Sequence, residues 1–159
     1  IQSIAWRNDN GGAWRCDNAP IALPLPETAA IYSAVMLGLR DYVAKNGFPG
    51  VIIGMSGGID SALTAAIAVD ALGPEAVHCV MMPSKFTSGD SLEDAAICSR
   101  LLGVRHDSIS IETAVAAFEA QLAPYFDAAT PATTHENIQP RCRGLILMAI
   151  SNSEGRLLL

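Results

Sequence analysis

No hydrophobic run in the sequence approaches the roughly 18 residues of a membrane-spanning helix, which argues against a membrane protein. Basic residues are scarce as well, with 10 Lys and Arg against 16 Asp and Glu and a formal net charge of -6. Because binding along a phosphate backbone needs a basic face, nucleic acid is not expected as a partner. The first residues show neither the charged nor the apolar segment of a signal peptide. We therefore expect a cytoplasmic protein.

The sequence also lacks any CxxC pair, and no cysteine has a metal-like spacing to a histidine. This argues against a zinc site and against a redox-active cysteine pair, and the thiols fit a reducing compartment. The histidines are scattered, so no metal or general-base role is expected for them. The residues interpreted as structural are Cys16, Cys79, Cys98, Cys142, His78, His106 and His135.

The apolar content is high for a domain of 159 residues, since half of the residues are hydrophobic and only 16% are charged. A chain of this length has room for one sizeable core. Either the core is large, as in a parallel sheet, or part of the apolar surface meets a partner. We expect both.

Residues 1–26 resemble a linker, because they combine the turn sequence NDNGG with several prolines. A helical pattern of apolar residues begins at Glu27 and ends at Asn46-Gly47. We expect a linker from an upstream domain over 1–26, and the N-terminal part of a truncated domain over 27–159.

After residue 50, short β-branched runs alternate with helical patterns. Such alternation predicts an α/β fold, a parallel sheet with helices on both faces, and ligands at the carboxyl ends of its strands. The expected strands are 51–53, 77–82, 106–111 and one beginning at 156, and the expected helices are 60–72, 91–102, 113–122 and 137–151.

The segment after the first of these strands, residues 54–61, reads GMSGGIDS. Gly57 and Gly58 permit positive φ angles and a close approach of ligand to backbone. Successive backbone N–H groups in such a loop can form an anion nest, and the helix N-terminus adds about half a positive charge. The two serines offer hydroxyl donors, and Asp60 offers an oxygen ligand suited to Mg²⁺. The segment therefore predicts a phosphate site.

A simpler interpretation is an ordinary glycine-rich turn in which Asp60 or Ser61 caps the helix. It accounts less well for eight suitable residues in a strand–loop–helix context. The segment is not GxxxxGK[ST], because no lysine follows, and it is not GxGxxG. We expect it to bind phosphate in another way.

The SGGIDS sequence resembles the pyrophosphate loop of the N-type ATP pyrophosphatases, a superfamily that includes NAD, GMP and asparagine synthetases and several tRNA-modifying enzymes. In these enzymes an oxygen nucleophile attacks the α-phosphate of ATP, pyrophosphate leaves, and a nitrogen or sulfur nucleophile displaces AMP. The resemblance implies an adenine nucleotide alpha hydrolase-like, Rossmann-like fold, ATP, and Mg²⁺ held by Asp60. It assigns ATP binding to Gly54, Met55, Ser56, Gly57, Gly58, Ile59, Asp60 and Ser61.

Two further segments resemble the glutamine-dependent NAD synthetases. Residues 81–88, MMPSKFTS, followed by DSLEDA at 90–95, look like the loop after the second strand of that family. Residues 136–144, ENIQPRCRG, are similar to its ENxQxRxRG signature. Helical spacing places Asn137 and Arg141 on one face, where an amide and a guanidinium fork suit a carboxylate or phosphate. The resemblance assigns both residues to deamido-NAD⁺.

The resemblance implies a ligase that forms a carbon–nitrogen bond. The nicotinate carboxylate of deamido-NAD⁺ would attack ATP to give NAD-adenylate and pyrophosphate, and ammonia would then displace AMP. Because the nucleophile belongs to the substrate, no catalytic side chain is expected. The resemblance also implies ammonia from glutamine, made by an upstream amidase domain, and a homo-oligomer, dimeric or higher.

Two alternatives stay open. One is another ATP pyrophosphatase that acts on a GMP precursor or on tRNA, although the tRNA enzymes would need a basic surface. The other is a module that binds ATP without turnover. In either case we expect Gly57→Val to remove ATP binding and leave the fold intact, because a Cβ there obstructs the approach of phosphate.

Overall fold

The chain forms two compact units, residues 1–31 and residues 32–159, which are described separately. The first unit holds a short antiparallel hairpin of strands β1 (Trp6–Asn8) and β2 (Trp14–Cys16). The expected linker over 1–26 thus contains paired backbone, and parts of it lie outside the described residues. The computed structural model describes residues 5–8, 11–16, 23–127 and 129–159.

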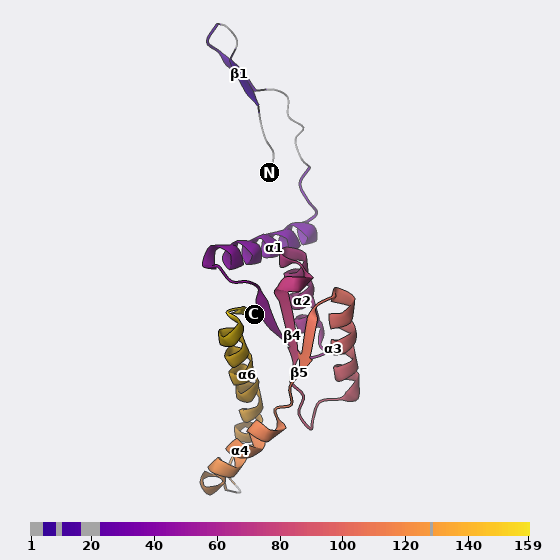
Figure 1. Cartoon of the computed structure of the whole chain (residues 1–159), viewed down its shortest axis with the longest axis vertical. Coiled ribbons are helices and arrows are strands. Elements are labelled where there is room, and N and C mark those ends of the chain that lie inside the picture. The colour runs from indigo at the N-terminus through magenta and orange to yellow at the C-terminus, as the bar shows by residue number, and fades with distance from the viewer. Residues whose placement is uncertain (1–4, 9–10, 17–22, 128) are drawn as a thin grey trace. The chain divides into compact units, whose positions relative to one another are not determined.

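The second unit is built on a four-stranded sheet in the order β5-β4-β3-β6, in which each neighbouring pair is parallel (Figure 1). Its strands are β3 (Val51–Met55), β4 (Val77–Met81), β5 (Arg105–Ser108) and β6 (Leu157–Leu158). The helices are α1 (Glu27–Asn46), α2 (Ile59–Leu72), α3 (Gly89–Leu102), α4 (Glu112–Leu122), α5 (Ala132–Glu136) and α6 (Ile138–Glu154), with 3-10 turns η1 (Pro74–Ala76) and η2 (Ala123–Tyr125).

Helices cover both faces of the sheet, as the alternating pattern predicts. Alternate residues of β3 divide between two cores, because side chains along a strand point to opposite faces. Ile53 packs with Ala65 of α2 and Ala95 of α3, and α1 adds Val43 to the same core. Ile52, on the other face, packs with residues of α4 and α6. The expected α/β fold is confirmed.

The structure corrects the expected helix over 137–151. Asn137 ends α5 and also precedes α6, which begins at Ile138 and runs on to Glu154. Pro140 fits the first turn of α6, where its missing N–H is not needed. Gly155, with φ +66°, ends the helix in the left-handed conformation. In the described part of the chain, no helix is long and apolar enough to cross a membrane.

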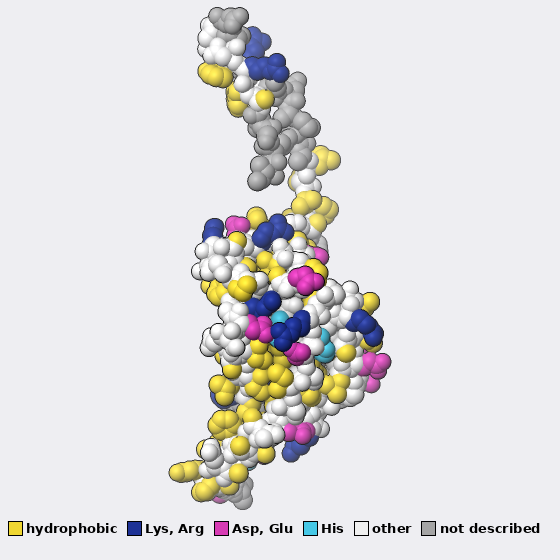
Figure 2. Space-filling model, viewed as in Figure 1, with side chains coloured by type: hydrophobic (Ala, Val, Ile, Leu, Met, Phe, Trp, Pro, Cys, Tyr) yellow, Lys and Arg dark blue, Asp and Glu magenta, His cyan; other side chains and the backbone are white. Residues whose placement is uncertain are grey.

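A buried histidine joins three elements near the amino ends of the strands. His78 of β4 is 1% exposed, and its Nε2 lies 2.8 Å from Asp107 Oδ2 of β5. Its Nδ1 lies 3.2 Å from Glu154 Oε2 of α6. Arg105 binds both carboxylates, at 2.7 Å and 2.8 Å, and Arg156 Nε lies 3.1 Å from Glu154. Figure 2 shows acidic, basic and histidine side chains gathered on this face of the second unit.

This network gives the fold a pH dependence. Burial alone raises the pKa of Asp107 and of Glu154, but the hydrogen bonds with His78 and Arg105 outweigh it and hold both below their ordinary values of 3.8 and 4.5. A carboxyl whose pKa is lowered by folding stabilises the fold above its unfolded pKa. That contribution is lost as the pH falls through the folded pKa.

We therefore expect the free energy of unfolding, measured with urea between pH 7 and pH 3, to fall at the acid end. Combining Asp107→Asn with Glu154→Gln should lower the free energy of unfolding at pH 7. It should also make the fall in this free energy between pH 7 and pH 3 less steep. Asp41→Asn is the matched control, because Asp41 forms an exposed pair with Lys45 at 3.6 Å, of the kind that contributes little to stability. If the free energy of unfolding fell as steeply with decreasing pH in the double variant as in the parent, this account would be contradicted.

Candidate functional site

The glycine-rich loop lies at the carboxyl end of β3 and leads into α2. Gly57 has φ +79°, and Gly58, the N-cap of α2, has φ -91° and ψ 162°. The first helical hydrogen bond runs from Ala62 N to Gly58 O at 3.2 Å. The N–H groups of residues 59–61 therefore have no partner within the helix and form its positive end. This is the arrangement expected for anion binding.

The two serine hydroxyls hold the loop in shape. Ser61 Oγ donates to Gly58 O at 3.0 Å and accepts from Ser56 N at 3.2 Å. Ser56 Oγ accepts from Gly58 N at 3.2 Å and lies 3.0 Å from Ser61 Oγ. The sequence suggests these hydroxyls as donors to a ligand, whereas here they bond within the loop. The N-cap is a glycine without a side chain, so the simple capping interpretation is wrong.

Gly57 also packs against the start of α3. A Cβ at this position would overlap the backbone oxygen of Ser91 and lie 2.8 Å from its Cα. The expectation that Gly57→Val leaves the fold intact is therefore wrong, because backbone atoms cannot yield as a flexible side chain does. Gly58 differs, since a Cβ there would meet only Ser56 Oγ, at 3.3 Å.

A cavity of about 510 Å³ adjoins the loop and lies between the carboxyl ends of strands β3 and β4 and helix α6. Its size is typical of small-molecule sites. A Cβ on Gly54 would lie 3.0 Å from Leu147 Cδ1, so space at this position is tight, whereas a Cβ on Gly144 would meet no atom within 4 Å. The lining residues are Gly54, Met55, Ser56, Met81, Met82, Thr87, Pro140, Arg143, Gly144 and Leu147.

Arg143 is the basic residue that α6 contributes to this cavity. Its Nε donates to Met82 O at 3.1 Å, just past the end of β4. Sequence reasoning singled out Arg141 and missed Arg143, although both lie in the ENIQPRCRG segment. Helical spacing could have pointed to Arg143. Spacings of three and four residues place it on one face of the helix with Pro140, Gly144 and Leu147, which also line the cavity. Buried Cys142 separates this face from that of Arg141.

Asn137 and Arg141 lie together, as their spacing predicts, but outside the cavity beside the loop. Arg141 Nη1 donates to Asn137 O at 2.9 Å, and both residues are exposed. They line a separate pocket of about 350 Å³, together with Leu122, Phe126, Thr134 and Ile138.

Asp60 lies in the first turn of α2, beside the free N–H groups, and is exposed. Its backbone oxygen accepts a 2.8 Å hydrogen bond from Thr64 Oγ1. Across the described ranges, no three His, Cys, Asp or Glu side chains gather in a way that could hold a metal ion.

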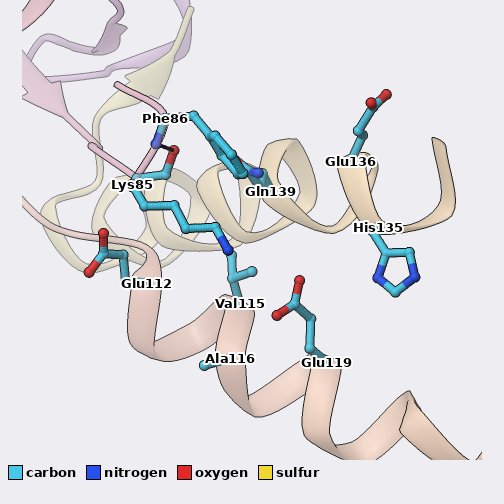
Figure 3. Close-up of a pocket in the computed structure, with 10 residues that line it drawn as sticks. Lys85, Phe86, Glu112, Val115, Ala116, Glu119, His135, Glu136 and Gln139 are labelled. Atoms are coloured by element: carbon cyan, nitrogen blue, oxygen red, sulfur yellow. Dashed lines mark hydrogen bonds between the residues drawn. The ribbon is translucent and has the colours of Figure 1, made fainter. Parts of the chain in front are cut away.

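A third pocket, of about 470 Å³, opens between α4, the start of α6 and the loop after β4 (Figure 3). Lys85 Nζ lies 5.1 Å from the centre of the Phe86 ring. Glu112 and Glu119 of α4 and Gln139 of α6 also line the pocket. Its lining therefore combines one basic side chain with acidic ones.

Comparison with known proteins identifies the family. The family model described as NAD synthase matches residues 31–159. A glutamine-dependent NAD(+) synthetase from Rhodobacter capsulatus is 53% identical over 146 residues, which cover 92% of this chain and 26% of that protein. The chain thus spans about a quarter of the length of this curated relative.

Solved structures agree. The glutamine-dependent NAD+ synthetase from Acinetobacter baumannii in complex with ADP has a TM-score of 0.85 at 47% identity, over 90% of this chain and 27% of that chain. The NH3-dependent NAD synthetase from Campylobacter jejuni, in complex with the nitrate ion, has a TM-score of 0.74 at 28% identity, over 84% of this chain and 56% of that chain. The chain described here belongs to the NAD synthase family.

Proposed function

We propose that this chain carries the ATP-binding part of a glutamine-dependent NAD synthetase. The enzyme amidates deamido-NAD⁺ to NAD⁺ through an NAD-adenylate intermediate and releases AMP and pyrophosphate. The observation that carries the proposal is a loop that ends at the positive end of α2 and whose first residues, 54–56, line a cavity of about 510 Å³. The Acinetobacter baumannii relative was solved in complex with ADP, which supports nucleotide binding by this domain.

The two halves of the site suit the two halves of ATP. The cavity is lined by apolar groups such as Met82 and Leu147 and suits the adenosine. The loop N–H groups, at the positive end of α2, suit the phosphates and the departing pyrophosphate. Arg143 lines the cavity and adds a fixed positive charge. These groups bind, orient and neutralise charge, while the attacking oxygen comes from deamido-NAD⁺.

Mg²⁺ fits the donor set around the loop. This ion keeps several waters and is held by one or two carboxylates together with substrate phosphates. Asp60 supplies one carboxylate in the first turn of α2, beside the loop where phosphates would bind. When bound, the ion offsets negative charge on the phosphates.

Asn137 and Arg141 are the residues we assign to deamido-NAD⁺. Their pocket is separate from the cavity beside the loop, which suits a second substrate. A groove of about 290 Å³ next to Arg141 is lined almost entirely by apolar side chains, including Phe118 and Leu145, which are 41% and 63% exposed. A second copy that covers this groove would form a homo-oligomer with the substrate near the contact.

The direct test uses the longer protein with ATP, Mg²⁺ and ammonium. Deamido-NAD⁺ should be required for release of pyrophosphate, and one NAD⁺ should form for each pyrophosphate. Xanthosine monophosphate and tRNA are the substrates of the rival ATP pyrophosphatases and should not replace it. Turnover with either of them, or ATP binding without any turnover, would refute the proposal.

Gly144 offers a test of the cavity. Gly144→Ala should raise the free energy of unfolding by about 0.5–1 kcal/mol, because alanine favours the helix and its Cβ meets no atom. Gly144→Leu should instead weaken ATP binding, by roughly 1–3 kcal/mol, by filling the adenosine space. Urea unfolding measures the change in stability, and calorimetric titration measures the change in ATP affinity.

Gly38→Leu is the matched control for Gly144→Leu. Gly38 also lies within a helix, and a Cβ there also meets no atom within 4 Å. Full ATP affinity in Gly144→Leu would show that the adenosine binds elsewhere.

Arg141→Lys should weaken binding of deamido-NAD⁺ by about 1–3 kcal/mol and leave ATP affinity unchanged, because lysine keeps the charge but loses the planar fork. Arg143→Lys should show the opposite preference, since Arg143 lines the ATP cavity. Titration of each variant with each substrate separates the two sites. An Arg141→Lys variant that loses ATP and keeps the dinucleotide would show that the assignments are reversed.

A further inference from the structure

The hairpin of the first unit presents two tryptophans on one face. Its register pairs Trp6 with Cys16 and Asn8 with Trp14. Because cross-strand partners and every second residue share a face, Trp6 and Trp14 lie on the same side, diagonal to each other. Their side chains are 59% and 65% exposed, and they are the two tryptophans of the chain.

This face has the features of a contact surface. A two-stranded hairpin by itself is at best marginally stable in water. Tryptophan is enriched among the residues that dominate binding energies, because a large apolar ring is joined to an N–H donor. A partner surface with apolar patches and hydrogen-bond acceptors at their edges would complement both rings.

The comparisons indicate which partner this is. The NAD synthase family model begins at residue 31, so the hairpin lies outside it. The Rhodobacter capsulatus match covers 146 of 159 residues, so it includes residue 14 and therefore Trp14 and the rest of β2. This chain spans 26% of that glutamine-dependent relative but 56% of the NH3-dependent chain. Strand β2 of the hairpin is thus matched in a glutamine-dependent relative, most of whose length lies outside this chain.

We propose that the tryptophan face of the β1–β2 hairpin docks on the glutamine-hydrolysing part of the longer protein and keeps ammonia production coupled to amidation. The inference rests on the proposed function, because it requires a glutamine-dependent enzyme. Its consequence is selective: free ammonium bypasses the contact, whereas ammonia from glutamine depends on it.

The test compares two nitrogen sources in the longer protein. Trp6→Ser combined with Trp14→Ser should lower glutamine-driven NAD⁺ formation by at least about tenfold, as when aromatic interface anchors are removed. Ammonium-driven formation should stay within twofold, roughly the noise of a neutral surface substitution. The ammonium rate also reports whether the synthetase part remains folded. Trp6→Phe with Trp14→Phe should recover most of the glutamine-driven rate.

Leu101→Ser is the control, because Leu101 of α3 is 80% exposed and lies far along the chain from the hairpin. It should change neither rate. An unchanged glutamine-driven rate in the double serine variant, or an equal loss with both nitrogen sources, would overturn the docking proposal. So would conversion of an oligomer to monomers in sedimentation, because the face would then meet a second copy. Absence of ammonium-driven synthesis in the parent protein would instead refute the proposed function.

Discussion

Asp60→Asn in the longer protein should lower the rate of NAD⁺ formation by about 10²–10³-fold, the effect of losing one electrostatic stabiliser, while ATP still binds. The carboxylate lies in the first turn of α2, where we propose that the backbone N–H groups bind phosphate. Loss of its charge removes the proposed protein ligand of Mg²⁺ but leaves those N–H groups in place. AMP release measures the rate, and calorimetric titration measures ATP affinity.

Asp70→Asn is the matched control for this change. Asp70 lies on the same helix and is exposed, but it accepts a 2.6 Å hydrogen bond from Tyr32 rather than facing the loop. Both variants remove one negative charge from α2, so a general effect of charge would appear in both. Turnover by Asp60→Asn near that of the parent would exclude Asp60 from the metal site.

Gly57→Val should abolish ATP binding and also lower the melting temperature. Gly57 has φ +79°, and a Cβ would overlap the backbone of Ser91 at the start of α3. The change therefore distorts the loop and separates it from α3. Because stability and binding fall together, this variant alone does not isolate the role of the loop.

Gly58→Val separates the two effects. Its φ of -91° and ψ of 162° suit any residue, and a Cβ would meet only Ser56 Oγ, at 3.3 Å. We expect a melting temperature close to that of the parent and a fall in ATP affinity of roughly 1–3 kcal/mol, because side-chain atoms then crowd the anion nest. Unchanged ATP titrations for a folded Gly58→Val protein would show that the phosphates do not bind at this loop.

The sequence was sufficient for the parts of the fold that depend on local pattern. A β-branched run such as 51–53 reads as a buried strand, and alternation with helices predicts a parallel sheet. A loop at a carboxyl strand end is then a ligand site by topology alone. The strand–loop–helix arrangement of residues 51–72 is confirmed for this reason.

What the sequence did not reveal depends on contacts between distant segments. Whether Arg141 or Arg143 lines the cavity depends on the phase of α6 against the sheet, which the bond from Arg143 to Met82 O helps fix. The His78 network joins residues 29 and 76 positions away, so no local pattern marks it. The one indication in the sequence was His78 itself, a polar residue within an otherwise apolar strand, because a buried imidazole needs hydrogen-bond partners.

The β1–β2 hairpin was missed for another reason. Its strands have three residues each, too few for an alternating pattern to stand out from a glycine-rich turn. Turn residues and prolines are equally typical of linkers. The two tryptophans were the distinguishing feature, and their common face follows only from the register.

The central claim is that ATP bound at this loop adenylates the nicotinate carboxylate, and oxygen transfer tests it most directly. The longer protein would convert deamido-NAD⁺, labelled with ¹⁸O in its carboxylate, in the presence of ATP and ammonium. If the carboxylate attacks the α-phosphate, one ¹⁸O must leave with AMP, and mass spectrometry should find it in the AMP phosphate. Formation of ADP with ¹⁸O in inorganic phosphate would contradict the account, because the attack would then be on the γ-phosphate.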